Sequence, residues 1–372
     1  MTTEVVVDAP SEHSAIRRFA VWGIPAAFTL GWLLFVFGAG HFERVIDNWR
    51  AALTMVFGSF VAGSTPQGGG AVAFPVFTKV LAIPAEVARS FSLVIQATGM
   101  VAASISIVLA GRKIDWKAVG LGVAGGSVGF LFGLFVLGDS STAFWSPRIA
   151  PAYVKVAFTI AIFGVAVIVK VCMGRTAKYE KVEDWGKRSV VVMSAFAIVG
   201  GIFSSLAGSG ADVLLFVFIV LVAQVSPRVA IPTSIIAMAL ISVLGLAILG
   251  IGHGQLDIAL NNAGDQVVAV AGNAFGPESA IRFDLFGIWL AAAPIVVWGA
   301  PLGAWLAAKL PEKTVIRFVA FMALLEVATT AIFLDDLRDD AVLVAFFILG
   351  LIAAWIVIPR LDRLSAWIMA GE

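Results

Sequence analysis

The apolar stretch over residues 51–78 is interrupted by Ser64-Thr65-Pro66-Gln67-Gly68-Gly69-Gly70, which holds three glycines in a row. A second apolar stretch is interrupted about 142 residues later by Ala207-Gly208-Ser209-Gly210-Ala211-Asp212. Hydrocarbon tolerates unwound backbone only where protein or a watery cavity satisfies its amide and carbonyl groups. Two broken helices at matching places in two halves are therefore typical of a transporter's substrate site. Close helix packing is the alternative role for these glycines, but Pro66 and Asp212 fit an interruption better.

The composition is that of a helical integral membrane protein. Apolar residues make up 60% of the 372 residues, charged residues make up 13%, and the mean hydropathy is +1.00. A spanning helix needs about 20 apolar residues in a row, whereas a barrel strand would alternate. Six uncharged runs meet the helix requirement: 19–40, 91–111, 118–138, 229–252, 285–308 and 341–359.

The sequence gives no sign of a cofactor, a metal or a nucleic acid. The net charge is +1, and no basic cluster suggests a nucleic-acid partner. His13, His41 and His253 lie at the ends of segments, so no metal cluster can be assembled from them. The single cysteine, Cys172, cannot form an internal disulfide and is expected to be a small buried apolar residue.

Lys and Arg gather in loops that we assign to the cytoplasm, because basic residues favour that side of a membrane. The longest basic loop is 174–188, and further basic residues stand in 112–117 and 309–313. The acidic segment 335–340 and the long connection 253–282 are then expected outside. Both termini are expected in the cytoplasm, and the protein in the cytoplasmic (inner) membrane.

Two segments are long for one crossing and short for two. If 51–83 and 190–223 are re-entrant hairpins that enter from opposite faces, every basic loop falls inside. The predicted fold is an all-α integral membrane protein with two inverted-topology repeats, about eight membrane-spanning helices and two broken helical hairpins. The spanning helices are expected at 19–40, 90–110, 118–138, 153–173, 229–250, 285–308, 314–334 and 341–358.

This pattern divides the chain into five parts. They are an N-terminal segment with the first helix (1–50), a first repeat (51–173), a cytoplasmic basic linker (174–189), a second repeat (190–334), and a last helix with the C-terminal tail (335–372). At the offset of 142, Gly68 aligns with Gly210, and the same sequence features follow one another in the same order in both halves. The pieces 126–129 and 300–303 also resemble each other, and small-residue packing seams are the favoured interpretation.

At these residues the chain resembles the TauE/SafE family of sulfite exporters, the TSUP permeases. The pieces that carry the resemblance are Gly-Gly-Gly-x4-Pro at 68–75, Ile83-Pro84-x3-Ala88, Gly208-Ser209-Gly210 and 299–303. The resemblance covers roughly 51–334, so the first and last helices are additional. The second half departs from the pattern, with Asp212 where the first half has Gly70 and no counterpart to Pro75. Membership implies export of sulfite or a small organosulfur anion.

The predicted site has two polar layers. Half-helices that begin near Gly70 and Asp212 would aim backbone N–H groups and positive dipole ends at the midplane, which suits an anion. Local helix capping is the alternative role for the side chains in the breaks. The first layer comprises Ser64, Thr65, Gln67, Gly68, Gly69, Gly70, Gly208, Ser209, Gly210 and Asp212. The second layer, at the start of the next helix of each half, comprises Arg89, Ser90, Ser92, Gln96, Thr233 and Ser234.

The charged side chains within the apolar segments have alternative roles that the sequence leaves open. Arg89 can fork two oxygens of a sulfonate, or it can snorkel or pair with Glu86. Asp212 can cap a half-helix, pair with a cation or carry a proton. Glu326 can be a second proton site or face a polar gap, and Lys79 is expected to snorkel.

The predicted function is that of a secondary transporter, not an enzyme, that exports sulfite or a small organosulfur anion through a midplane site. An importer, or a proton-coupled carrier of another small anion, is the alternative. A receptor-like membrane protein would need no paired breaks. An intramembrane hydrolase built on Ser209 would need a base, and no histidine lies inside a predicted span. The oligomeric state stays open.

Overall fold

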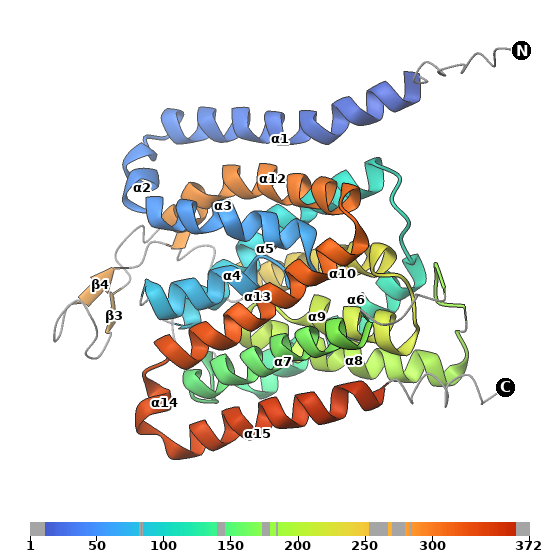
Figure 1. Ribbon diagram of the computed structural model, residues 1–372. Helices are drawn as coiled ribbons and strands as arrows, with labels where there is room; N and C mark the ends of the chain where they lie inside the picture. The colour runs from blue at the N-terminus through green and yellow to red at the C-terminus, as the bar shows by residue number, and fades with distance from the viewer. Residues whose placement is uncertain are drawn as a thin grey trace, which may run out of the picture.

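The computed structural model describes residues 12–81, 83, 85–139, 146–172, 179–183, 185–252, 267–269, 280–282 and 285–361. Its long helices are α1 (Glu12–Gly38), α3 (Trp49–Ser64), α5 (Ala85–Leu109), α6 (Trp116–Val136), α7 (Pro151–Cys172), α8 (Lys187–Ala207), α10 (Pro227–Ala247), α12 (Leu285–Lys309), α13 (Glu312–Phe333) and α15 (Ala341–Val357). They lie side by side as one bundle (Figure 1).

Shorter elements connect these helices. The short helices are α2 (Phe42–Asp47), α4 (Gly70–Pro75), α9 (Ala211–Val217) and α14 (Asp336–Asp339). Three π-helical turns, η1 (Val76–Val80), η2 (Phe218–Val222) and η3 (Ile248–Gly252), and one 3-10 turn, η4 (Ile358–Leu361), extend helices. Two antiparallel strand pairs are formed by β1 (Gly138–Asp139) with β2 (Ser146–Pro147), and by β3 (Val267–Ala269) with β4 (Ala280–Arg282).

Nine helices in the described part of the chain are long and apolar enough to cross a bilayer. They are α1, α5, α6, α7, α8, α10 with η3, α12, α13 and α15 with η4. The prediction of an all-α membrane protein is therefore confirmed. Eight of the nine match the spans expected from the sequence. The ninth, α8, is the long limb of the predicted second hairpin, and the short limb is α9 with η2.

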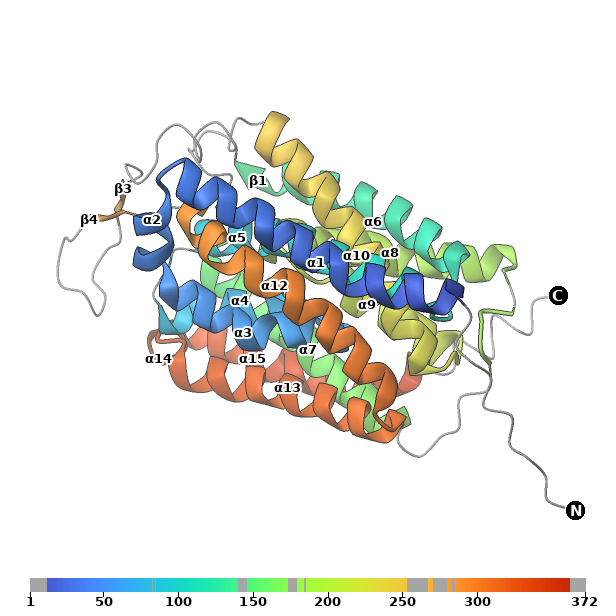
Figure 2. The same cartoon turned by 90° about the horizontal axis from the view of Figure 1, so that it is seen from above.

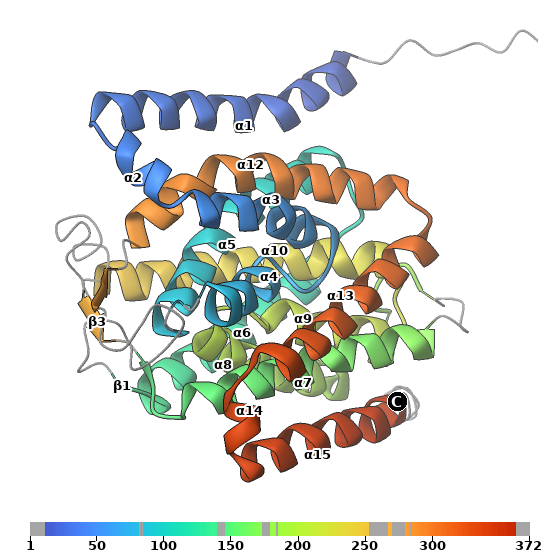
Figure 3. The ribbon, with the colours of Figure 1, turned by 60° about the vertical axis from the view of Figure 1, so that its left-hand side comes forward.

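Helices α1 and α15 lie on opposite outer faces of the bundle (Figure 3). Leu34 on α1 is 68% exposed and Leu349 on α15 is 63% exposed, as expected of helix faces in contact with lipid tails. Seen from above, α1 runs along α12 (Figure 2). The indole Nε1 of Trp32 donates a 2.9 Å hydrogen bond to the carbonyl oxygen of Leu290, which attaches α1 to α12.

The two ends of the bundle separate the loops as the charge pattern predicts. The elements α2, α14 and the β3–β4 pair lie at one end, whereas α1 begins and α15 ends at the other (Figure 1). The amide of Val182 donates a 3.0 Å hydrogen bond to Asp115 Oδ2, so two basic turns meet. Which end faces the cytoplasm stays a prediction. Residues 174–178, much of 253–282 and both chain ends lie outside the described residues.

The order of elements recurs at the predicted offset. The turns η1 and η2 begin 142 residues apart, and so do α5 and α10. Each half has a long helix, a glycine break, a short helix and a π-helical turn in that order. Helix α3 packs along α12, and α8 packs along α6, so each long limb contacts a helix of the other half. The opposite orientation of the two halves in a membrane stays a prediction.

Glycines permit the close approach of these long limbs. A Cβ on Gly129 of α6 would collide with the carbonyl oxygen of Ile198 on α8, and one on Gly303 of α12 would collide with that of Phe60 on α3. Helix backbones can approach this closely only where one side carries no side chain. The prediction that 126–129 and 300–303 are packing seams is confirmed.

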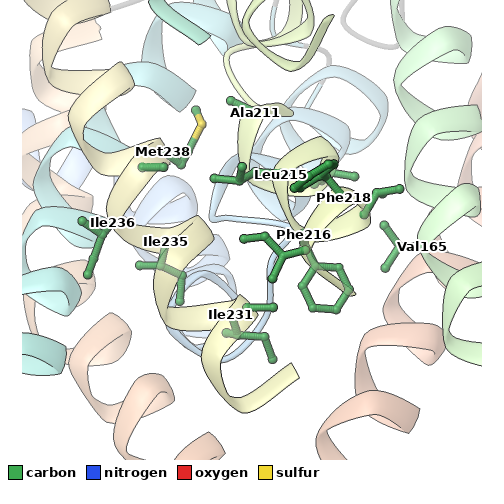
Figure 4. Packing of buried hydrophobic residues seen from close by; sticks show 14 of the residues in the cluster. Val165, Ala211, Leu215, Phe216, Phe218, Ile231, Ile235, Ile236 and Met238 are labelled. Atoms are coloured by element: carbon green, nitrogen blue, oxygen red, sulfur yellow. The ribbon is translucent and has the colours of Figure 1, made fainter. Parts of the chain in front are cut away.

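The second broken helix is enclosed by the largest apolar cluster. Phe216 and Phe218 pack among Ile235 and Met238 of α10 and Val165 of α7 (Figure 4). Each of these five side chains is at most 3% exposed. The residues of the polar break that precedes α9, 207–212, are buried as well.

Candidate functional site

The two glycine breaks contact each other. The backbone adopts left-handed φ values of +68° at Gly68, +78° at Gly208 and +137° at Gly210, a region that glycine enters without strain. Between the breaks, Ser209 Oγ donates a 3.3 Å hydrogen bond to the carbonyl oxygen of Gln67. These two residues are 142 positions apart, at the predicted offset. The expected meeting of the breaks is therefore present in the structure.

Polar atoms from three elements converge on Gly68. A Cβ at Gly68 would lie 2.6 Å from Asp212 Oδ2, 3.3 Å from Gln96 Oε1 and 3.4 Å from Ser209 Oγ. A Cβ at Gly70 would collide with Gln96 Nε2. The first break therefore needs glycine both for its φ angle and for space, because the second break and α5 approach its backbone directly.

Helix α5 packs against the second break. Gln96 is 1% exposed, and its Nε2 donates a 2.8 Å hydrogen bond to the carbonyl oxygen of Gly208. A Cβ on Gly208 would lie 2.6 Å from the carbonyl oxygen of Arg89 and 2.7 Å from the Cβ of Ser92. The Ser92 hydroxyl itself donates to Ala88 within α5 at 2.8 Å. The predicted second layer of the first half thus adjoins the second half's break.

Arg89 is fully buried and tied to α8. Its Nη1 donates to the carbonyl oxygen of Ser205 and its Nη2 to Ser90 Oγ, both at 3.3 Å. The guanidinium therefore does not snorkel to an interface. The side chain of Glu86, its predicted partner, lies outside the described residues. These contacts place the buried guanidinium of Arg89 beside residues that flank the second break.

Asp212 is the buried acid of the site. Its Oδ1 accepts a 3.0 Å hydrogen bond from the amide of Val213, within the first turn of α9. Its Oδ2 and Gln96 Oε1 are buried and accept no hydrogen bond from the described residues. Buried polar atoms almost always have partners, so two unpaired acceptors beside one glycine need an explanation. Both atoms can accept a hydrogen, and neither can donate one while Asp212 is ionised.

Ser204 is a contributor that sequence reasoning missed. Its Oγ accepts a 2.9 Å hydrogen bond from the amide of Ala211, which begins α9. The sequence offers no local signal for this bond, because Ser204 lies in the last turn of α8, seven residues before Ala211, whereas the N-cap position of α9 is Gly210. Two of the amides that the sequence assigns to an anion, those of Ala211 and Val213, are therefore used within the protein.

Ser64 and Thr65 follow the capping alternative. Ser64 Oγ donates to the carbonyl oxygen of Phe60 at 2.7 Å, and Thr65 Oγ1 donates to that of Val61 at 2.9 Å. Both hydroxyls bond back to a carbonyl oxygen four residues earlier in α3, which is the common local bond of serine and threonine in a helix. A hydroxyl that bonds back to its own helix remains able to accept a hydrogen bond, as Thr65 Oγ1 does from the amide of Gln67 at 3.3 Å.

The two second-layer hydroxyls of α10 are engaged away from the breaks. Thr233 Oγ1 donates to the carbonyl oxygen of Val229 at 2.7 Å and accepts from the amide of Asp115 at 3.1 Å, beside the start of α6. Ser234 Oγ donates to the carbonyl oxygen of Ile231 at 3.0 Å. The position that matches Gln96 at the offset of 142 is Met238, so the second half has no equivalent amide there.

Lys79 and Glu326 form a separate buried cluster. Lys79 Nζ lies 2.8 Å from Glu326 Oε1 and 2.7 Å from Thr330 Oγ1, and Thr159 Oγ1 donates to Glu326 Oε1 at 3.0 Å. The Lys79 side chain is 3% exposed and that of Glu326 is 8% exposed. Lys79 therefore pairs with an acid and does not snorkel, which corrects the sequence interpretation. The cluster joins η1 to α7 and α13.

Two cavities flank α5. One, of about 110 Å³, is lined near the end of α5 by Gly63, Ile107, Arg112, Arg228 and Glu312. The other, of about 220 Å³, is nearly all apolar and is lined near the start of α5 by Ser90, Leu93, Val94, Thr98, Leu285 and Trp289. They approach the residues beside the breaks from opposite ends of the helix.

Comparison with known proteins agrees with this architecture. Residues 51–330 match the family model described as sulfite exporter TauE/SafE. Neither curated proteins nor solved structures yield a match to the chain. The matched region includes both glycine breaks and the helices around them, and it leaves α1 and α15 outside, as the sequence resemblance predicts. The chain therefore belongs to the sulfite exporter TauE/SafE family and is a multi-pass membrane transporter of that type.

Proposed function

We propose that the protein exports sulfite, or a small organosulfur anion, out of the cytoplasm through the two glycine breaks. The observation that carries this proposal is the contact between the two breaks, where Ser209 Oγ donates to the carbonyl oxygen of Gln67 beside the side-chain-free backbone of Gly68. Irregular backbone in a membrane protein is tolerated where it lines a binding site or cavity. Family membership supports the substrate class.

The first break supplies the donor side of the site. Gly68, Gly69 and Gly70 carry no side chains, so a small oxyanion can approach their backbone closely. The helix formed by α4 and η1 begins at Gly70, and its positive end faces the break. The buried guanidinium of Arg89 adds a positive charge on the α5 side. Together these groups favour an anion over a cation when Asp212, which lies beside Gly68, carries a proton.

The membrane potential favours export over import. An anion that leaves a negative-inside cell gains about 2.3 kcal/mol per charge for each 100 mV, and divalent sulfite gains twice that. An electrogenic uniport therefore needs no coupling ion to move sulfite outward. Import of the same anion would have to oppose this gradient.

Anion flux in proteoliposomes tests the proposal. Purified protein is reconstituted, and sulfite flux is measured with sulfonates, thiosulfate and sulfate as competitors. We expect saturable sulfite flux that an imposed potential accelerates in the direction that moves the anion to the positive side. Flux no greater than in protein-free liposomes, from protein that remains folded by circular dichroism, would contradict the proposal.

A proton-coupled carrier is the second candidate, and the unpaired acceptors favour it. Asp212 Oδ2 and Gln96 Oε1 lie within 3.3 Å of one point and accept no hydrogen bond from the described residues. A proton on Asp212, or a substrate such as hydrogen sulfite that carries its own hydrogen, would satisfy both oxygens. An ionised carboxylate costs about 2.5–3.5 kcal/mol at the centre of a membrane helix, which also favours a proton there.

Asp212→Asn separates the two candidates. The amide keeps the shape of the carboxyl, and its oxygen can still accept from the amide of Val213. If Asp212 carries a coupling proton, the variant loses flux driven by a pH gradient but retains anion exchange. If the protein is a uniport, potential-driven flux persists in the variant and a pH gradient drives no flux in either protein.

A further inference from the structure

The cavity of about 110 Å³ lies between α5, α10, α12 and α13. Its buried lining includes Gly63, which precedes the first break by two residues, whereas the side chain of Arg228 in its lining is 65% exposed. The cavity thus extends from a solvent-accessible guanidinium to the last turn of α3. Its volume is large enough for a small ion with a few waters, because one water needs only about 10–15 Å³ of such space.

The lining carries an excess of positive charge. Two arginines, Arg112 and Arg228, and one acid, Glu312, are its charged lining residues. Arg228 Nε lies 3.9 Å from Glu312 Oε2, a long contact for an ion pair. Arg112 is half-buried and makes no ion pair within the described residues. One positive charge is therefore left over in the cavity.

The walls strengthen the field of these charges. The remaining lining is apolar and includes Ile107, Ile231, Ile235 and Val315. A cleft of one charge sign between walls of low dielectric constant concentrates counter-ions and accelerates their arrival. Helices α10 and α13 both begin at this cavity, so their positive dipole ends add to the same field.

The cavity opens at the end of the bundle that the charge pattern assigns to the cytoplasm. Arg112 stands in the turn between α5 and α6, Arg228 at the start of α10 and Glu312 at the start of α13. The turn before Arg228 also meets the basic linker, because the amide of Ser226 donates to the carbonyl oxygen of Tyr179 at 3.0 Å. A cytoplasmic anion would reach this cavity before the breaks.

We propose that this cavity is an anion vestibule, in which Arg112 and Arg228 draw a small sulfur oxyanion toward Gly63 and the first break. The proposal gives both arginines a role in substrate capture beyond the positive-inside pattern. It rests on the proposed anion transport, and its principal test is independent of flux.

Charged thiol reagents measure the field directly. Ala307→Cys, in a Cys172→Ala background, places a thiol in the cavity lining. Methanethiosulfonates that carry a negative or a positive group are added to vesicles with the cytoplasmic face outward. The attacking thiolate itself favours the cationic reagent, so the ratio of anionic to cationic rates is compared with that of the control thiol described below, and we expect it to be about tenfold higher in the cavity. Arg112→Gln and Arg228→Gln should each lower that ratio, and Glu312→Gln should raise it.

Gly120→Cys is the matched control. Gly120 lies on α6, outside the cavity lining, and a Cβ there meets no atom within 4 Å. Its reagent ratio should stay the same when Arg112 or Arg228 is replaced. A reagent ratio at Ala307→Cys equal to that of the control, an unreactive thiol there, or a ratio insensitive to both arginines would each overturn the vestibule.

Measurements of sulfite flux distinguish failure of the vestibule proposal from failure of the proposed transport function. Arg112→Gln should raise the half-saturation concentration for sulfite on the cytoplasmic side several-fold at low ionic strength, with less effect at 1 M salt, where the Debye length falls to about 3 Å. If the thiol is charge-selective but the protein transports no sulfite, the vestibule is upheld and sulfite transport is refuted. Sulfite flux with a reagent ratio equal to that of the control would refute only the vestibule.

Discussion

The two buried polar clusters of this protein differ in how far their hydrogen bonds are satisfied. In the Lys79–Glu326 cluster, Glu326 Oε1 receives hydrogen bonds from Lys79 and from Thr159. At the glycine breaks, Asp212 Oδ2 and Gln96 Oε1 receive none from the described residues. A satisfied network fixes the elements it joins, whereas unsatisfied acceptors in a buried place are suited to a ligand or a proton.

The two clusters also lie at the two ends of the same broken helix. The helix formed by α4 and η1 begins at Gly70, beside the breaks, and carries Lys79 near its other end. The ion pair attaches that end to α13 and α7. The break can then keep an unwound geometry, because the segment that follows it is held by contacts outside the site.

The largest expected effect comes from breaking the satisfied cluster. Glu326→Ala leaves the Lys79 charge buried without its partner, which should reduce the free energy of unfolding by about 3–5 kcal/mol. Thermal unfolding of the purified protein in detergent measures this loss. The double variant Lys79→Met/Glu326→Leu removes both charges and should regain most of the stability. A single variant as stable as the parent would show that the pair contributes nothing.

Gly68→Ala tests the unsatisfied region. The φ of +68° is strained for alanine, and the added methyl group would displace the Asp212 carboxyl, whose Oδ2 would lie 2.6 Å from it. Displacement of about 1 Å at a binding site can cost about 100-fold in rate, and we expect a loss of sulfite flux of that order. Gly120→Ala on α6, where a Cβ meets nothing within 4 Å, should keep parental flux. Parental flux in Gly68→Ala would exclude the breaks as the site.

Thr330→Val tests whether the Lys79–Glu326 cluster serves stability alone. The variant keeps the shape of the side chain but removes the hydroxyl that bonds Lys79 at 2.7 Å and Thr159 at 2.7 Å. A buried group that loses a hydrogen-bond partner costs about 1–3 kcal/mol of stability. Flux per folded molecule should stay unchanged, because this cluster does not contact substrate. Altered half-saturation with unchanged stability would instead assign Thr330 to the transport path.

Arg89→Lys should have the smallest effect. Lysine keeps the positive charge near the second break but cannot bond Ser205 and Ser90 with a planar fork. We expect a half-saturation concentration for sulfite that rises about threefold, roughly 0.6 kcal/mol, with expression unchanged. An unchanged value would restrict Arg89 to joining α5 and α8 and leave the backbone of the first break as the principal anion ligand.

The sequence alone determined the class, the breaks and the repeat spacing. Hydrocarbon requires long uncharged runs for each crossing, so the length and polarity of a segment show locally where the helices lie. Glycine, proline and aspartate in an apolar run mark an interruption for the same reason. The offset of 142 aligned the two breaks with each other, and the structure adds that the aligned residues Gln67 and Ser209 are in contact.

Only the tertiary structure decided which polar groups share a site. Lys79 and Glu326 are 247 positions apart, and nothing near either residue indicates the other. Gln96 reaches Gly208, whereas Thr233 caps the turn before α6, although both were expected in the same polar layer. Such partners depend on how the helices cross and on which side chain lies within hydrogen-bond distance of an unsatisfied backbone group. Neither the crossing nor that distance can be derived from the local sequence.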